Sequence, residues 1–289
     1  MWKRIRRDLG KTGESFWIPE NLEIKEKGNR MERREIYTKI TGKAETMKQE
    51  LVKIRRDFHR YPELGWMEMR TSSIIASYLK RVGCDEVLVG RDVCLDEARM
   101  GLPADEALER HYEEAAAQEG TDLAYLPDTK GGFTGVVGIL RCGEGPTVAF
   151  RFDMDALPVL ECKEETHYPA KEGFASRNTG VMHACGHDGH MTVGLGTAKI
   201  LCELREQLHG TVKFIFQPAE EGGGGAKAMI KDGVLENPHV DILLGMHLLF
   251  NPAGTLAFKR GYALTASDSF TLTITGKGGH GAKPHETND

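Results

Sequence analysis

Apolar residues recur along much of the chain at the three-to-four spacing that is typical of helices. The clearest stripe runs between residues 45 and 61, stops before Pro62, and consists of Leu51, Ile54, Phe58 and Tyr61. Similar spacing or helix-forming composition predicts further helices over 71–82, 103–120, 191–208 and 226–231. Gly83 directly follows the first of these and is expected to end it.

Short apolar runs between these segments predict strands over 86–90, 133–141, 147–152, 211–216 and 240–246. Because strands alternate with helices, the expected fold class is α/β, with a mixed twisted sheet flanked by helices. The helix over 103–120 separates two predicted strands, which indicates an insertion near a binding face. Residues 158–182 show neither period and are expected to form an irregular loop.

The two ends of the chain differ from this central part. Residues 1–40 are dense in charge and lack a sustained apolar period, which predicts a disordered extension. Residues 269–275 alternate polar and apolar side chains strictly, which predicts a half-exposed strand. We therefore expect a charged extension over 1–40, a central domain over 41–264, and the beginning of a second domain over 265–289.

Composition excludes several classes of function. With 38 Lys and Arg against 43 Asp and Glu, the formal charge of −5 argues against a dedicated nucleic-acid binder. No apolar run approaches the roughly 20 residues that cross a bilayer. Six cysteines are too few for a disulfide scaffold, so a reducing, cytoplasmic setting is expected. The glycine run at 222–225 lacks the spacing of a phosphate loop, which argues against nucleotide binding.

Side chains suited to metal chemistry follow three predicted strands. Asp153 and Asp155 lie at the end of one strand, Glu220 and Glu221 follow the next, and His247 follows the last. In open α/β sheets ligands bind at the carboxyl ends of strands, so one shared site is expected. Adjacent acids cannot face the same way, so one of the glutamates can bind a metal while the other faces the substrate.

The densest cluster is the segment 183–190, with three histidines, one cysteine and one aspartate. Cys185 and His187 can turn toward one metal ion. We expect Asp188 to cap the helix that follows, and His190 to pack or support the site rather than bind metal. Taken singly, each cluster keeps a structural alternative: a loop-capping aspartate pair, a solvated acidic loop, or a packed histidine.

Five stretches of the chain resemble motifs of the M20 metallopeptidase family. They are residues 55–59, 153–157, 182–190, 216–222 and 278–285, and the resemblance covers about residues 45–289. The match is to the amidohydrolase branch, which includes aminoacylases and auxin-conjugate hydrolases. It implies a zinc-peptidase-like catalytic domain and an inserted lid and dimerisation domain that begins near residue 265. It also implies two divalent metal ions, Zn²⁺ or Mn²⁺, bound by Cys185, His187, Glu221 and His247.

The same resemblance assigns further roles. Glu220 would be the general base, Asp155 and Asp153 would hold or polarise the site, and His280 would reach the substrate of a partner subunit. The implied reaction is hydrolysis of an N-acyl amino acid, with p-aminobenzoyl-glutamate as the expected substrate. The expected partner is a second copy or a related subunit. Family members continue past residue 289 and carry a further metal-binding histidine there, so the alternative is a truncated, inactive fragment that only binds metal or a partner chain.

Overall fold

The structure of the chain is a computed structural model that describes residues 2–6, 15–19, 30–259, 261 and 270–288. It divides into two compact units, Met1–Leu248 and Leu249–Asp289. The domain boundary that the sequence predicts near residue 265 lies outside the described residues. All residues of the candidate site except His280 belong to the larger unit.

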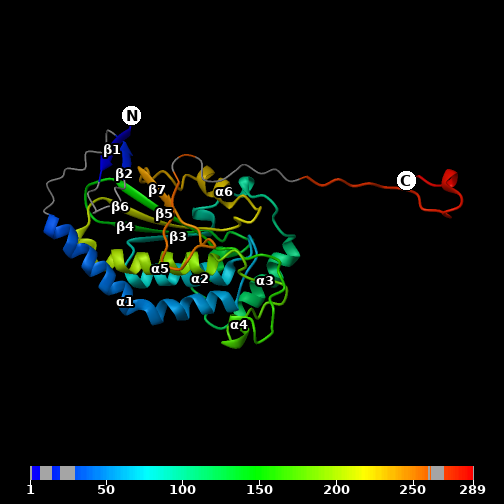
Figure 1. Cartoon of the computed structure of the whole chain (residues 1–289), viewed down its shortest axis with the longest axis horizontal. Coiled ribbons are helices and arrows are strands. Elements are labelled where there is room, and N and C mark those ends of the chain that lie inside the picture. Colours follow the sequence, from blue (N-terminus) through cyan, green and yellow to red (C-terminus); the bar gives the residue numbers. More distant parts are fainter. Residues whose placement is uncertain (1, 7–14, 20–29, 260, 262–269, 289) are drawn as a thin grey trace. The chain divides into compact units, whose positions relative to one another are not determined.

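The larger unit is built on a five-stranded sheet in the order β3-β4-β6-β5-β7 (Figure 1). The strands are β3 (Glu86–Val89), β4 (Val136–Arg141), β5 (Thr147–Asp153), β6 (Thr211–Gln217) and β7 (Ile242–Gly245). β5 runs parallel to both of its neighbours, while β4 is antiparallel to β3 and β6. The predicted mixed α/β sheet is confirmed. The carboxyl ends of β5, β6 and β7 therefore meet at one edge.

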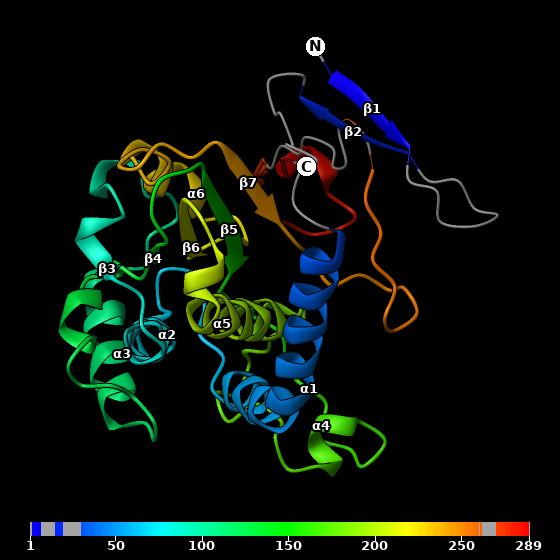
Figure 2. The ribbon, with the colours of Figure 1, turned by 90° about the vertical axis from the view of Figure 1, so that its left-hand side faces the viewer.

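Helices cover both faces of this sheet. They are α1 (Arg30–Arg60), α2 (Met69–Val82), α3 (Asp105–Ala117), α4 (Tyr168–Lys171), α5 (His187–Glu203) and α6 (Gly225–Lys231). Short 3-10 helices lie at Gly90–Asp92, Asp96–Ala98, Leu126–Thr129, Arg205–Gln207 and Pro284–Glu286. α2 and α5 lie on one face with α1 packed on α5, and α6 lies on the other face (Figures 1 and 2). Each helix within the described residues is too short or too polar to cross a membrane.

The core follows from the alternation of side chains along the strands. Phe152, Phe214 and Phe216 are fully or almost fully buried in the cluster that also holds apolar residues of α2 and α5. Ile139 and Ile215 belong to a second cluster, together with residues of α6. Buried apolar surface on both faces stabilises the sheet and fixes its register, because a slip of one residue would exchange the two faces.

The amino-terminal part of the chain carries more secondary structure than its composition predicts. β1 (Trp2–Arg6) pairs with β2 (Ser15–Pro19) in an antiparallel hairpin, and α1 begins at Arg30 rather than near residue 45. Long charged side chains are good helix formers, and pairs such as Glu35 with Lys39, 3.0 Å apart, support a helix at the i,i+4 spacing. The disorder expected over 1–40 stays a prediction for residues 1, 7–14 and 20–29, which lie outside the described residues.

The strand that the sequence predicts over 269–275 is not present in its described part. Residues 270–275 form no strand, and in the described part of this unit the backbone pairing is a single bridge between Lys277 and Asn288. Ser269 lies outside the described residues. An alternating sequence becomes a strand only when a neighbouring strand accepts its backbone hydrogen bonds, and the described residues of this unit provide no such neighbour for 270–275.

Candidate metal centre and active site

Two groups of possible metal ligands lie where β5, β6 and β7 end and α5 begins. In one, ligand atoms of Cys185, His187 and Glu221 all lie within 4.8 Å of one another. In the other, ligand atoms of Asp153, His187, His190 and His247 meet the same limit. His187 belongs to both groups, so the groups adjoin. The structure thus brings together the residues that were expected to share one site at the strand ends.

His187 is fully buried at the start of α5. Its Nδ1 lies 3.3 Å from an oxygen of Asp155, and its Nε2 lies 3.6 Å from Asp153 and 3.9 Å from Glu221. A carboxylate beside Nδ1 favours a proton on that nitrogen, which leaves the lone pair on Nε2. The free lone pair therefore faces the other possible ligands, as in metal sites where a carboxylate supports a ligating histidine.

His247 is oriented by its own backbone neighbour. Its Nδ1 donates a hydrogen bond to the carbonyl of Leu248 at 2.7 Å. Because a carbonyl can only accept, the proton is on Nδ1 and the lone pair is on Nε2. That Nε2 lies 3.3 Å from the sulfur of Cys185. The two side chains can therefore approach a common ion.

Both ring nitrogens of His190 already have polar neighbours. Its Nε2 accepts a hydrogen bond from the backbone N–H of Leu248 at 2.9 Å. The protonated Nδ1 then faces Asp153, 3.3 Å away. This arrangement is the one expected of a supporting residue, because His190 holds both Asp153 and the segment that carries His247.

Asp153 is held from a second side by Arg151, which forms a close ion pair with it and donates from Nε to Gln217 at 2.8 Å. Burial alone would raise the pKa of Asp153, but His190, Arg151 and His187 outweigh burial and lower it. Arg151 was not among the residues predicted from the sequence. The signal was present, since a charged residue within a buried strand needs a partner.

The carboxylates around this site repel one another. Burial, followed by the charges of Asp153 and Glu221, raises the pKa of Glu220. Burial and a hydrogen bond with Glu221 raise the pKa of the Cys185 thiol to about 12. Nε2 of His187 is a buried atom with no hydrogen-bond partner. A divalent cation would bind this lone pair and neutralise the surrounding negative charge, so the donor set fits a metal.

Asp155 links the end of β5 to the turn that follows β6. Its Oδ2 accepts a hydrogen bond from the backbone N–H of Glu221 at 2.8 Å, while its Oδ1 faces His187. Glu220 directly precedes Glu221 in the chain. Its side chain is 37% exposed, and its Oε2 lies 4.0 Å from Nε2 of His187. Glu221 thus points to the ligand group while Glu220 lies beside it and reaches solvent. Glu220 and Glu221 lie 4.0 Å and 3.9 Å from the same nitrogen, so the expectation that one binds metal and the other faces the substrate stays a prediction.

Asp188 does not have the capping position that the sequence predicts. Gly186 is the residue before α5, with a φ of 84° that glycine adopts at little cost, and Asp188 is the second residue of the helix. The Asp188 carboxylate instead accepts from Nδ1 of His59 at 2.9 Å, and Nε2 of His59 lies 2.9 Å from Glu161. This buried chain connects α1 to the helix that carries His187.

The His59 contacts predict a pH-dependent contribution to stability. Burial alone would lower the pKa of His59, but its hydrogen bonds to Asp188 and Glu161 outweigh burial and raise it. A free histidine titrates near 6.5, so this stabilisation is fully present below that pH and is lost as pH rises through the folded-state pKa. Replacing His59 with Gln should therefore lower the free energy of unfolding by about 1.5–3 kcal/mol at pH 6. The loss should be smaller at pH 9.

Urea unfolding of the wild type and the His59→Gln variant at the two pH values measures this effect. Taking the difference in the free energy of unfolding between the two proteins removes the contribution of the other titrating groups. A difference that stays constant from pH 6 to pH 9 would contradict a protonated His59 in the folded state.

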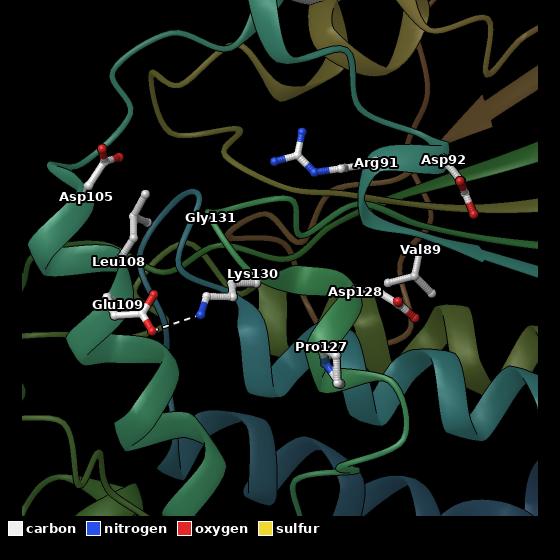
Figure 3. A pocket seen from close by; sticks show the side chains of 10 residues that line it. All are labelled: Val89, Arg91, Asp92, Asp105, Leu108, Glu109, Pro127, Asp128, Lys130 and Gly131. Carbon is white, nitrogen blue, oxygen red and sulfur yellow. Dashed lines mark hydrogen bonds and ion pairs between the residues drawn. The ribbon is translucent and has the colours of Figure 1, made fainter.

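Two other features belong to neither ligand group. His280 belongs to the smaller unit, where its Nδ1 accepts from the backbone N–H of Ala282 at 3.2 Å, and its predicted role toward substrate stays a prediction. In the larger unit a cavity of about 570 Å³ is bounded by α3 and two 3-10 helices (Figure 3). Figure 3 shows Lys130 turned toward Glu109 in an ion pair of 2.9 Å. No predicted metal or catalytic residue lines this cavity.

The sequence is similar to a family of peptidases and to several hydrolases. The model of Peptidase family M20/M25/M40 matches residues 149–289. One subunit of the p-aminobenzoyl-glutamate hydrolase of Escherichia coli is 45% identical over 235 residues, which are 80% of this chain and 53% of that protein. The indole-3-acetyl-aspartic acid hydrolase of Enterobacter agglomerans is 44% identical over 240 residues, covering 82% of this chain and 54% of that protein. The chain spans about half the length of these curated relatives.

The fold of this chain is also similar to that of solved structures. An aminobenzoyl-glutamate utilization protein from Klebsiella pneumoniae superposes with a TM-score of 0.60 at 39% identity, over 72% of this chain and 46% of that one. A dinuclear metal-binding peptidase of the M20 family from Bacillus subtilis gives a TM-score of 0.50 at 32% identity, over 70% of this chain and 43% of that one. The residues that match the family model, the identity to these relatives and the shared fold show that this chain belongs to Peptidase family M20/M25/M40.

Proposed function

We propose that this chain carries the metal centre of an amidohydrolase that cleaves the amide bond of an N-acyl amino acid. The observation that supports it most is the pair of adjoining ligand groups that share His187, with Glu220 beside them. Family membership supports the same reaction class, since two relatives that match over most of this chain are named as hydrolases of acylated amino acids. The proposal concerns the activity of the whole protein.

Four side chains would supply ligands to two divalent ions in this proposal. They are Cys185, His187 and Glu221 in one group, and His187 with His247 in the other, whose remaining members are Asp153 and His190. Thiolate and imidazole ligands suit Zn²⁺, and the carboxylate also suits Mn²⁺, so either metal fits the donor set. Asp155 would hold His187 and the backbone of Glu221, while Asp153 would hold His187 together with His190. When bound, divalent ions in such a site supply Lewis acidity toward a carbonyl oxygen and acidify a water molecule.

Glu220 would act as the general base. Glu220 and Asp155 both lie beside a ligand group without belonging to it. Asp155 is buried and already holds His187 and the backbone N–H of Glu221, whereas the carboxylate of Glu220 is partly open to solvent. Its side chain would accept a proton from the attacking water and return it to the leaving nitrogen, so that the C–N bond breaks to give a carboxylate and an amine. Because the side chain is partly exposed, it can meet both water and substrate.

We propose that the substrate is p-aminobenzoyl-glutamate and that the partner is a second copy or a related subunit. Support comes from the Escherichia coli relative, whose name gives this substrate and describes that protein as one subunit of its enzyme. Indole-3-acetyl-aspartate is the competing substrate, because its hydrolase is almost equally identical to this chain. Both substrates join an aromatic acyl group to an acidic amino acid, so an assay must compare them.

The test is hydrolysis of p-aminobenzoyl-glutamate, indole-3-acetyl-aspartate and an N-acetyl amino acid with added Mn²⁺ or Zn²⁺. We expect release of amino acid, fastest from p-aminobenzoyl-glutamate and abolished by a chelator. Faster hydrolysis of the indole conjugate would overturn the substrate assignment and keep the reaction class. If the chain binds metal but hydrolyses none of the three, the alternative that it only binds metal or a partner chain is supported instead.

A further inference from the structure

Glu68 is a buried carboxylate that contacts the turn between β6 and α6 from a distant part of the sequence. It immediately precedes α2, and its side chain has no exposed surface. Its Oε1 accepts a hydrogen bond from the backbone N–H of Ala219 at 2.8 Å. Its Oε2 accepts one from the hydroxyl of Thr134 at 2.6 Å. Both oxygens therefore have donors, and one of the donors belongs to the residue just before Glu220.

The residue that Glu68 holds has an unfavourable backbone conformation. Ala219 has a φ of +49°, in the left-handed region that residues other than glycine rarely adopt. Such a conformation persists only where the surroundings impose it. Two residues further on, Asp155 accepts from the backbone N–H of Glu221. Buried carboxylates thus anchor the backbone on both sides of Glu220.

Close packing leaves this turn little freedom to move. A Cβ atom on Gly65 would lie 3.1 Å from the Cα of Ala219, and one on Gly223 would lie 2.6 Å from the Cβ of Ala219. Both glycines are therefore needed for backbone to approach Ala219 this closely. Gly65 belongs to the same connection between α1 and α2 as Glu68. That connection supports the turn by packing and by hydrogen bonding at once.

Burying a carboxylate at this position costs more free energy than burying an apolar side chain, so packing alone does not explain Glu68. A buried carboxyl group loses its hydration, whereas an apolar side chain of similar size packs without that cost. What the carboxylate adds is a directed acceptor for the N–H of Ala219. Neither group of possible metal ligands contains Glu68, and its hydrogen bond toward the site is made to the backbone of this turn.

We propose that Glu68 is a positioning residue that fixes the Ala219 turn, so that Glu221 reaches the metal group and Glu220 faces the substrate. This inference rests on the proposed function. It differs from that proposal because it concerns a residue that touches neither metal nor substrate. It predicts that losing the Glu68 acceptor weakens metal binding even where the fold is retained.

The experiment measures Zn²⁺ affinity, by competition with a colorimetric chelator, for the wild type and three variants. Glu68→Met keeps the size of the side chain and removes the acceptor, while Glu68→Gln keeps an acceptor for Ala219. Glu63→Met is the matched control, because Glu63 is equally buried on the same connection but accepts from the backbone of Arg70 and Thr71 instead. Thermal unfolding of each protein is recorded in parallel.

We expect Glu68→Met to weaken Zn²⁺ binding by about 10–100-fold, the range for residues that orient metal ligands. Glu68→Gln should stay within about 3-fold of the wild type, since its amide oxygen can still accept the hydrogen bond from the N–H of Ala219. Glu63→Met should lose thermal stability and keep its Zn²⁺ affinity. This combination separates positioning of the turn from a general loss of stability, which would affect both Met variants alike.

Three results would overturn the inference. If the wild type binds Zn²⁺ and Glu68→Met binds it equally well, Glu68 has no positioning role and the proposed function stands. If the wild type has no affinity for Zn²⁺ or Mn²⁺, the proposed function is wrong and the inference falls with it. Should Glu68→Met not fold, Thr134→Val decides, because it removes one donor to Glu68 and should weaken binding by about 5-fold. Unchanged affinity in that variant would then overturn the inference.

Discussion

Replacing Glu220 with Gln is expected to lower kcat for amide hydrolysis by about 10²–10⁴-fold, the usual contribution of a general base. Glutamine has nearly the same shape as glutamate but cannot take a proton from water at neutral pH. Glu220 lies 4.0 Å from Nε2 of His187 and is absent from both ligand groups. The variant should therefore keep its bound metal. Amino acid release and metal content are measured on the same preparation.

Glu165→Gln provides the control for this measurement. Glu165 is an exposed glutamate outside both ligand groups, so its replacement should leave kcat and metal content unchanged. Two outcomes would contradict the assigned role of Glu220. Turnover close to that of the wild type would mean that another group takes the proton. Loss of metal together with activity would mean that Glu220 is a ligand and not the base.

Replacing His187 with Ala is expected to reduce bound metal more than any other single ligand replacement, from about two ions per chain to less than one. The reason is geometric, since His187 is the residue that the two ligand groups share. Its removal also takes away one partner that Asp153 and Asp155 share, so their charges repel more strongly. Activity should fall below detection with added Zn²⁺ or Mn²⁺.

His239→Ala is the matched control, because His239 is an exposed histidine that pairs with Glu236 and belongs to neither ligand group. Metal content measured after dialysis should match the wild type in this variant. Replacing Cys185 should have a smaller effect than replacing His187, since Cys185 belongs to one group alone. Equal losses from both replacements would contradict two adjoining sites that share one histidine.

The sequence predicted the location of the site because the relevant signals were local. Strands ended where Asp153, Glu220 and His247 followed, and parallel strands bring such ends to one edge of the sheet. Within α5 and the segment before it, Cys185 and His187 were close enough along the chain to indicate a common ion. Short-range pattern was enough for these residues.

The remaining contacts could not be predicted because they join distant segments. Glu68 and Ala219 are 151 residues apart, and Asp188 and His59 are 129 apart. No pattern within either segment shows which buried acid faces which backbone N–H or imidazole. Asp188 was misplaced for this reason: its position near the start of α5 resembles a cap, while its carboxylate serves a partner in α1.

Local pattern also failed where pairing partners decide the structure. The alternating residues 270–275 have the composition of a strand but lack a paired neighbour within the described residues. The charged residues at the start of α1 lack an apolar stripe, yet they form a helix that continues into the packed segment beyond residue 45. For residues 270–275 the outcome depends on what lies beside the segment, while the start of α1 depends on local charge pairs and on continuity with the packed part of the helix.

Metal content per chain tests the central claim most directly. The chain is purified, loaded with Zn²⁺ or Mn²⁺, dialysed, and analysed by inductively coupled plasma mass spectrometry. Two adjoining ligand groups that share His187 predict about two ions per chain. A folded chain that retains no divalent metal would contradict the proposed metal centre, and with it the assignment of Glu220 as a general base.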